Sequence, residues 1–254
     1  MNPVPLLSAG ALARFPTVRH GFTTRAGGVS TGALASLNLG RRDDETPGHL
    51  VENWTRVANT LDASLGASRV AVMSQVHGAH VLVVDAPQGP LNVVGEADGA
   101  VTTATDVILA VRVADCVPVL FAAPGGVAVA HAGWRGVAAG VAPKTARVLC
   151  DVTGCLRAEV VAVVGPHISG ERFEVGDEVV DALIAAGLDA DTFVVKRAPK
   201  PYVDLRRAVT RQLEALGVVV EHVYGCTIDD ERFFSHRRGG PKTGRFAGVI
   251  VRRP

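Results

Sequence analysis

The chain has 254 residues, of which 48% are hydrophobic, so it can bury one substantial core or two modest ones. Its formal net charge of +1 gives no electrostatic basis for binding nucleic acid or acidic membranes, and no apolar run is long enough to span a bilayer. The four cysteines form no C-x-x-C pair and the N-terminus has no signal-peptide pattern, so we expect a cytoplasmic protein with reduced thiols.

The first half of the chain predicts one helix followed by a run of strands. No linker or low-complexity tract interrupts the sequence, so we expect a single domain over residues 1–254. Residues 49–61 predict a helix that places the following side chains on one face: Leu50, Trp54, Val57, Ala58 and Leu61. Short strands are expected at residues 70–72 and 81–84.

Three apolar strands follow in close succession, at residues 107–113, 117–122 and 127–131. Nearly every residue in them is apolar, which indicates strands that are covered on both faces. The segment Ala123-Pro124-Gly125-Gly126 predicts a hairpin turn between the last two.

The second half predicts three helices and three strands. Residues 137–150 favour a helix in which Pro143 either causes a kink or lies in the first turn. Helices at residues 177–186 and 204–216 each have an aspartate as the expected N-cap, Asp177 and Asp204. Strands are expected at residues 160–164, 218–223 and 246–251. Strand clusters interrupted by helices, without regular βαβ repeats, favour an α+β fold with mixed β-sheets and flanking helices.

One thiol and two imidazoles offer a candidate metal site: His77 in Gln-Val-His-Gly, Cys116 after Asp115, and His131 at the end of an apolar strand. Three protein ligands leave the fourth tetrahedral position of a zinc ion open, as in catalytic zinc sites. The separations of 39 and 15 residues suit a site assembled from separate strands. By spacing alone, a buried cysteine and two core histidines explain these residues better than a metal does.

Several motifs in order resemble the YfiH family, which is also called the laccase-domain, multicopper polyphenol oxidase or peptidoglycan editing factor family. These motifs cover nearly the whole chain and include His20-Gly21-Phe22-Thr23-Thr24-Arg25, Ser36-Leu37-Asn38-Leu39-Gly40, Gln75-Val76-His77-Gly78, Ala114-Asp115-Cys116-Val117-Pro118, Ala130-His131-Ala132-Gly133-Trp134-Arg135-Gly136 and Arg232-Phe233-Phe234-Ser235-His236.

This resemblance implies zinc bound by His77, Cys116 and His131. It also implies a cytosolic enzyme that cleaves adenosine, inosine, guanosine and methylthioadenosine with phosphate, and that deaminates adenosine. The implied fold is α+β, akin to cysteine hydrolases of the cytotoxic necrotising factor type. Purine nucleosides and phosphate are the expected partners, and a monomer or small homo-oligomer is the expected assembly.

The implied chemistry assigns further residues. Deamination needs a water activated by the metal and a group that moves protons, for which Asp98 and Asp115 are candidates; either could instead orient a metal ligand, and we favour that role for Asp115. Phosphate capture calls for guanidinium groups. Arg25 in a glycine-rich loop fits this task best, followed by Arg135 and Arg245, and Asn38 could contact a base or ribose or fix its own loop.

Three rival functions use the same residues. Cys116 could be the nucleophile and His131 the base of a thiol hydrolase that acts on peptidoglycan precursors. A copper ion could occupy the same three ligands, although eight histidines without a His-x-His pair make the trinuclear centre of a multicopper oxidase very unfavourable. In the third rival, Cys226 would complete a structural zinc site of an interaction module.

Overall fold

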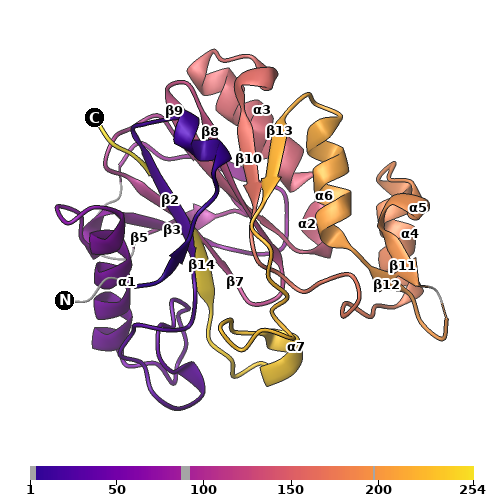
Figure 1. Ribbon diagram of the computed structural model, residues 1–254, viewed down its shortest axis with the longest axis horizontal. Coiled ribbons are helices and arrows are strands. Elements are labelled where there is room, and N and C mark those ends of the chain that lie inside the picture. The colour runs from indigo at the N-terminus through magenta and orange to yellow at the C-terminus, as the bar shows by residue number, and fades with distance from the viewer. Residues whose placement is uncertain (1–3, 87–91, 197) are drawn as a thin grey trace.

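Two six-stranded mixed sheets form the centre of the protein (Figure 1). The computed structural model describes residues 4–86, 92–196 and 198–254. The first sheet has the order β1-β2-β14-β7-β3-β5. Its strands are β1 (Leu6–Leu7), β2 (Val18–Thr23), β14 (Phe246–Arg252), β7 (Ile108–Val113), β3 (Val70–Ser74) and β5 (Asn92–Glu96).

The second sheet has the order β13-β10-β8-β9-β6-β4. Its strands are β13 (Val219–His222), β10 (Val161–Val164), β8 (Val117–Ala123), β9 (Gly126–Ala132), β6 (Gly99–Thr102) and β4 (Val81–Val83). Both sheets contain parallel and antiparallel pairs; for example, β3 runs parallel to β7, whereas β8 and β9 form an antiparallel hairpin. A small antiparallel ribbon of β11 (Val194–Lys196) and β12 (Tyr202–Val203) stands apart.

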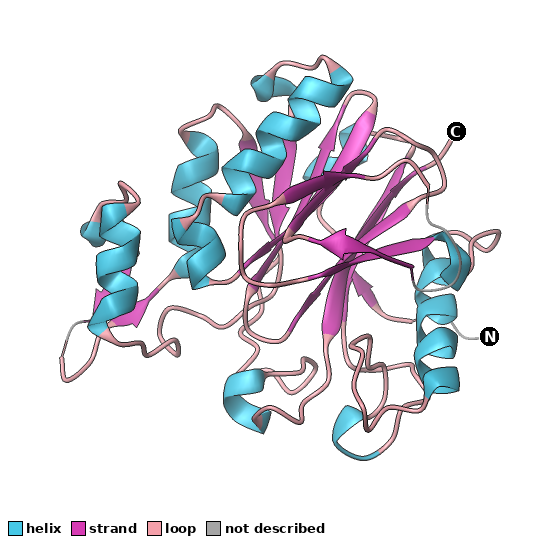
Figure 2. Cartoon of the chain, turned by 180° about the vertical axis from the view of Figure 1, so that it is seen from behind, coloured by secondary structure: helices cyan, strands magenta, loops and turns pink. Residues whose placement is uncertain are grey.

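The two sheets pack face to face, and helices cover their outer faces, which gives four layers (Figure 2). The helices are α1 (Pro47–Leu61), α2 (Trp134–Ala138), α3 (Val141–Thr153), α4 (Asp177–Ala185), α5 (Ala190–Phe193), α6 (Leu205–Glu214) and α7 (His236–Gly239). Helix α1 covers the first sheet, while α3 and α6 cover the second. No helix in the described part of the chain is both long and apolar enough to cross a bilayer.

The strand alternation explains why the central strands are apolar throughout. On β8, Val119 and Phe121 point to the helix-covered core, whereas Leu120 points to the core between the sheets. Both sets of side chains are fully buried, because one face meets helices and the other meets the first sheet. The prediction that these strands are covered on both faces is therefore confirmed, as is the α+β class with mixed sheets.

Two helix predictions need correction. The helix expected at 137–150 is two helices, α2 and α3, separated at Gly140, whose φ of 74° breaks the helical path. Pro143 lies in the first turn of α3, where a missing N–H costs nothing, so the second of the two interpretations holds. Asp177 is not an N-cap: Gly176 occupies that position and Asp177 begins α4, whereas Asp204 does cap α6 by accepting a hydrogen bond from the Arg207 amide.

Candidate functional site

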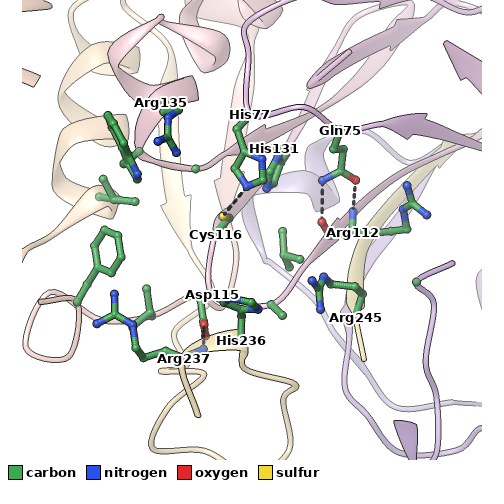
Figure 3. A pocket seen from close by; sticks show the side chains of 18 of the residues that line it. Gln75, His77, Arg112, Asp115, Cys116, His131, Arg135, His236, Arg237 and Arg245 are labelled. Carbon is green, nitrogen blue, oxygen red and sulfur yellow. Dashed lines mark hydrogen bonds between the residues drawn. The ribbon is translucent and has the colours of Figure 1, made fainter. Parts of the chain in front are cut away.

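The three candidate ligand side chains lie next to one another (Figure 3). His77 lies on the crossover from β3 to β4, Cys116 on the crossover from β7 to β8, and His131 near the end of β9. Their ligand atoms all lie within 4.8 Å of one another, and Cys116 Sγ is 3.9 Å from His77 Nε2. Tetrahedral zinc would place such a sulfur and nitrogen about 3.6 Å apart. These residues can therefore hold a metal ion.

Gly133 lets the ligands approach this closely. A Cβ at this position would lie 2.8 Å from His77 Cδ2 and 3.1 Å from Cys116 Sγ. Contacts this short force neighbouring atoms to move, so an alanine would push two ligands outward. The backbone itself is not the obstacle, because the φ of Gly133 is −70°, which any residue adopts.

We accordingly expect Gly133→Ala to weaken metal binding about tenfold or more, a loss of the size caused when ligands are misoriented. The stability of the metal-free protein should change little. Metal affinity is measured by competition with a chromophoric chelator, with Gly48→Ala as the matched control because nothing lies within 4 Å of a Cβ there. Equal affinities in the two variants would contradict the steric role of Gly133.

Asp98 holds the two histidines in place from behind the site. Its carboxylate accepts hydrogen bonds from His131 Nδ1 (2.7 Å) and from the backbone N–H groups of Val76, His77 and Gly78 (3.2, 3.0 and 2.6 Å). Its side chain is fully buried and does not line the cavity. Because Nδ1 of His131 is engaged, Nε2 is the nitrogen left for a metal or a thiol. These contacts are those of a residue that orients metal ligands.

Two residues of the site, the candidate ligand His77 and Asp115 next to Cys116, have left-handed backbone conformations. The φ values are 62° at His77 and 92° at Asp115, a region that residues other than glycine seldom adopt. Hydrogen bonds hold both loops: Asp98 accepts the His77 amide, and Asp115 Oδ1 and Oδ2 accept Thr227 Oγ1 and the Arg237 amide, each at 2.6 Å. Asp115 therefore ties the Cys116 loop to the start of α7.

The Cys116 thiol and the His131 ring each shift the pKa of the other. Burial would raise the pKa of Cys116, but the charges and hydrogen bonds of His131 and His77 outweigh it and lower the pKa to about 6. Burial would likewise lower the pKa of His131, yet Cys116 and Asp98 raise it to about 9. Without a metal, these shifts favour a thiolate–imidazolium pair over the neutral pair.

A cavity of about 520 Å³ opens in front of the ligands. It is lined by His77, Cys116 and His131, by the aromatic side chains of Trp134 and Phe173, and by the arginines Arg41, Arg42, Arg112, Arg135, Arg237 and Arg245. Arg135 stacks on Trp134 with its guanidinium carbon 4.2 Å from the ring centroid. This volume is within the range of small-molecule sites.

Two of the four expected substrate residues line this cavity and two do not. Arg135 and Arg245 do line it. Arg25 lies elsewhere: its Nε donates to the Ala35 carbonyl and its guanidinium stacks on Phe234. Asn38 is fully buried and fixes the surrounding loops, because its Oδ1 accepts the Gly40 and Arg245 amides.

Sequence reasoning missed Arg112, which lines the cavity from within β7. The available signal was a single cation in the apolar run Ile-Leu-Ala-Val-Arg-Val. Cys226, considered as a fourth zinc ligand, lines a separate cavity with His167 and is not part of the ligand group. The structure therefore gives no support to a four-ligand structural site.

The chain is similar over nearly its whole length to a known protein family and to several of its members. A family model described as multi-copper polyphenol oxidoreductase laccase matches residues 19–253. A purine nucleoside phosphorylase from Deinococcus radiodurans is 39% identical over 249 residues, which cover 97% of this chain and 92% of the relative. The purine nucleoside phosphorylase YfiH from Escherichia coli is 36% identical, with 90% and 91% of the two chains covered.

Solved structures share the whole fold. The YfiH protein of Bacillus licheniformis superposes with a TM-score of 0.88 at 28% identity, covering 99% of this chain and 97% of that protein. YlmD of Geobacillus stearothermophilus superposes with a TM-score of 0.86 at 32% identity, covering 99% and 100%.

Proposed function

The chain belongs to the multi-copper polyphenol oxidoreductase laccase family, and from that membership we propose that it is a zinc-dependent purine nucleoside phosphorylase that also deaminates adenosine. The relatives named purine nucleoside phosphorylase support the reaction class. The observation that carries the proposal is the position of His77, Cys116 and His131 on the wall of a cavity that also holds aromatic side chains and arginines.

We propose zinc rather than copper because the proposed deamination needs activation of a water molecule and not electron transfer, although the donor set itself accepts either metal. A thiolate and two imidazoles are ligands that zinc accepts, and three protein ligands leave one position open. When bound, zinc supplies Lewis-acid activation of water for deamination. In the described residues, these three side chains form the one group of at least three potential ligands, so a multicopper cluster has no support there.

In the proposed phosphorolysis, an oxygen of phosphate bonds to the anomeric carbon of ribose while the bond from that carbon to the purine nitrogen breaks. The products are ribose 1-phosphate, or 5-methylthioribose 1-phosphate from methylthioadenosine, and the free base, which takes up the proton lost by phosphate. The arginines would hold the phosphate, and Trp134 and Phe173 offer apolar ring faces for the base. Adenosine, inosine, guanosine and methylthioadenosine share this purine–ribose unit and are the proposed substrates.

The decisive experiment incubates the purified protein with adenosine, with and without phosphate, and separates the products by chromatography. Adenine that forms only with phosphate would show phosphorolysis, and inosine would show deamination. Metal analysis of the same sample should give about one zinc per chain. A zinc-loaded protein that converts no nucleoside would refute the proposal, and an intense visible absorption band would point to copper instead.

One observation favours a second function: Cys116 lies next to His131, and His131 is hydrogen-bonded to Asp98. A low-pKa thiol, an imidazole and a carboxylate bonded to its Nδ1 are the parts of a thiol hydrolase. The substrates considered for such an enzyme are peptidoglycan precursors. A bound metal would block this thiolate, so the two functions require opposite metal states of the site.

We expect Cys116 of the metal-stripped protein to react with iodoacetamide mainly as the thiolate. Its rate should rise with pH through about 6 and level off above neutrality, since the fraction of thiolate rises through the pKa. Cys150 is the internal control: burial and then Cys155 raise its pKa to about 11, so it should react slowly at pH 7. Peptide mass spectrometry distinguishes the two sites. A Cys116 rate that still rises steeply above pH 8 would contradict the expected ionisation, and added zinc should protect Cys116.

A further inference from the structure

The charge of the large cavity is poorly balanced. Six arginines line it, whereas Asp115 is the one carboxylate among its described lining residues. Both oxygens of Asp115 already accept hydrogen bonds at 2.6 Å, from Thr227 Oγ1 and the Arg237 amide. Arg42 is paired with Asp44. Within the described residues, the other five guanidinium groups of the cavity form no ion pair with a carboxylate.

Arg112 is the most unusual of these arginines. It projects from the central, apolar strand β7, and its Nη2 donates to the Met73 carbonyl at 2.7 Å. Its Nε is shielded from solvent without a hydrogen-bond partner, and no carboxylate of the described residues pairs with its guanidinium. Burial first, and then the charges of Arg245 and Arg41, lower the pKa of Arg112 to about 10.

Arg245 is held beside it by the loop before β14. Its Nη1 donates to the carbonyls of Thr243 and Gly244, both at 3.0 Å, and its amide donates to Asn38 Oδ1 at 2.9 Å. Gly40 packs on its aliphatic stem, where a Cβ would come within 2.8 Å of Arg245 Cγ. These contacts hold the side chain in position but leave its charge without an ion-pair partner among the residues that the structure describes.

Like charges gathered in a partly buried site are costly unless an anion joins them. Guanidinium groups bind phosphate through paired, charge-assisted hydrogen bonds. Arg112 Nε is shielded from solvent and has no hydrogen-bond partner among the described residues, so the protein alone does not satisfy this guanidinium group. The other flank of the cavity is different, because Arg135 stacks on Trp134 and Arg237 stacks on Phe173. Figure 3 shows Arg112 and Arg245 on one side of the His77–Cys116–His131 group, and Arg135 and Arg237 on the other.

We propose that Arg112 and Arg245, with Arg41 nearby, form a binding site for a tetrahedral phosphate group. This assignment rests on the proposed function in one respect: in phosphorolysis the bound group is the inorganic phosphate that attacks the ribose. The base then occupies the opposite, aromatic flank beside Trp134 and Phe173. The same chemistry would also fit the phosphoryl group of a nucleotide, and the experiment separates these two sources.

The test measures binding of inorganic phosphate to the metal-loaded protein by isothermal titration calorimetry, in the absence of nucleoside. One phosphate should bind per chain, and Arg112→Gln and Arg245→Gln should each weaken it about 10- to 100-fold, the loss expected for a charge-assisted hydrogen bond. Arg112→Lys keeps the positive charge but loses the bidentate hydrogen bonding of the guanidinium group, so it should recover part of the affinity that Arg112→Gln loses. Arg69→Gln is the matched control, since Arg69 is exposed and lies before β3.

Kinetics identify the source of the phosphate. If free phosphate is the ligand, Arg112→Gln raises the KM for phosphate about tenfold or more while the KM for adenosine changes less than about twofold. If a nucleotide is the ligand, the variant loses affinity for AMP but not for adenosine; this supports the anion site and rejects its role in phosphorolysis. Phosphate binding without any nucleoside turnover would likewise support the anion site and reject its role in phosphorolysis. Wild-type affinity for phosphate and AMP in both glutamine variants would overturn the proposal.

Discussion

Cys116→Ala and His131→Ala are each expected to lose the bound metal and to stop nucleoside turnover. Each variant removes one of three ligands whose atoms lie within 4.8 Å of one another. Even outer-shell partners of a metal contribute about 10- to 100-fold in affinity or activity, so loss of a direct ligand should exceed about a hundredfold. Metal content by mass spectrometry and product formation by chromatography are the two readouts.

Cys155→Ala is the control for loss of a thiol, because Cys155 lies near Cys150 rather than in the ligand group. Cys116→Ala should remain folded. His131→Ala should also lose some stability, since it leaves the buried Asp98 carboxylate without its imidazole partner. Nucleoside turnover by a metal-free Cys116→Ala protein would disprove the zinc mechanism.

Asp98→Asn should weaken both the metal site and the fold. The carboxylate accepts four hydrogen bonds, two on each oxygen. An amide group offers donors on one side, so two N–H groups lose their acceptor, at about 1–3 kcal/mol each. Metal affinity should fall about 10- to 100-fold, because the histidine ligands are no longer held. Chemical denaturation and chelator competition measure the two effects.

The control for Asp98→Asn is Asp181→Asn, which changes an exposed carboxylate on α4. A change confined to stability, with wild-type metal affinity, would mean that Asp98 supports the loop but not the ligands. A direct role of Asp98 in moving substrate protons predicts a third result, in which the metal is retained at full affinity while deamination alone is lost.

The sequence predicts elements best where one physical signal dominates. Helix α1 has a clear apolar face, and β7, β8 and β9 are nearly all apolar. Strand β2 was missed, because Arg19, His20 and Gly21 interrupt its apolar residues. Its strand conformation depends on pairing with β14, more than 200 residues away, which local patterns do not reveal.

The candidate site shows the same limit. Spacing alone could not select His77, Cys116 and His131, because two crossovers between the sheets and the end of β9 bring them together in the folded chain. Arg25 and Asn38 have the residue types expected for substrate contacts, yet tertiary packing turns them toward Ala35 and Gly40. Arg112 differs from Arg25 and Asn38, because a single cation inside an apolar strand already indicates that this side chain has a specific role. Its position on the cavity wall, however, follows only from the order of the strands in the sheet.

The position of β14 has a consequence for synthesis of the protein on the ribosome. All strands of the second sheet come from residues 81–222, so that sheet and the three ligands can assemble before the C-terminal segment is made. The first sheet stays incomplete until β14 is made, because β14 lies between β2 and β7 and pairs with both. A chain that stops early would present two open strand edges, which promote aggregation. Arg245 directly precedes β14, so the cavity wall is also among the last parts to form.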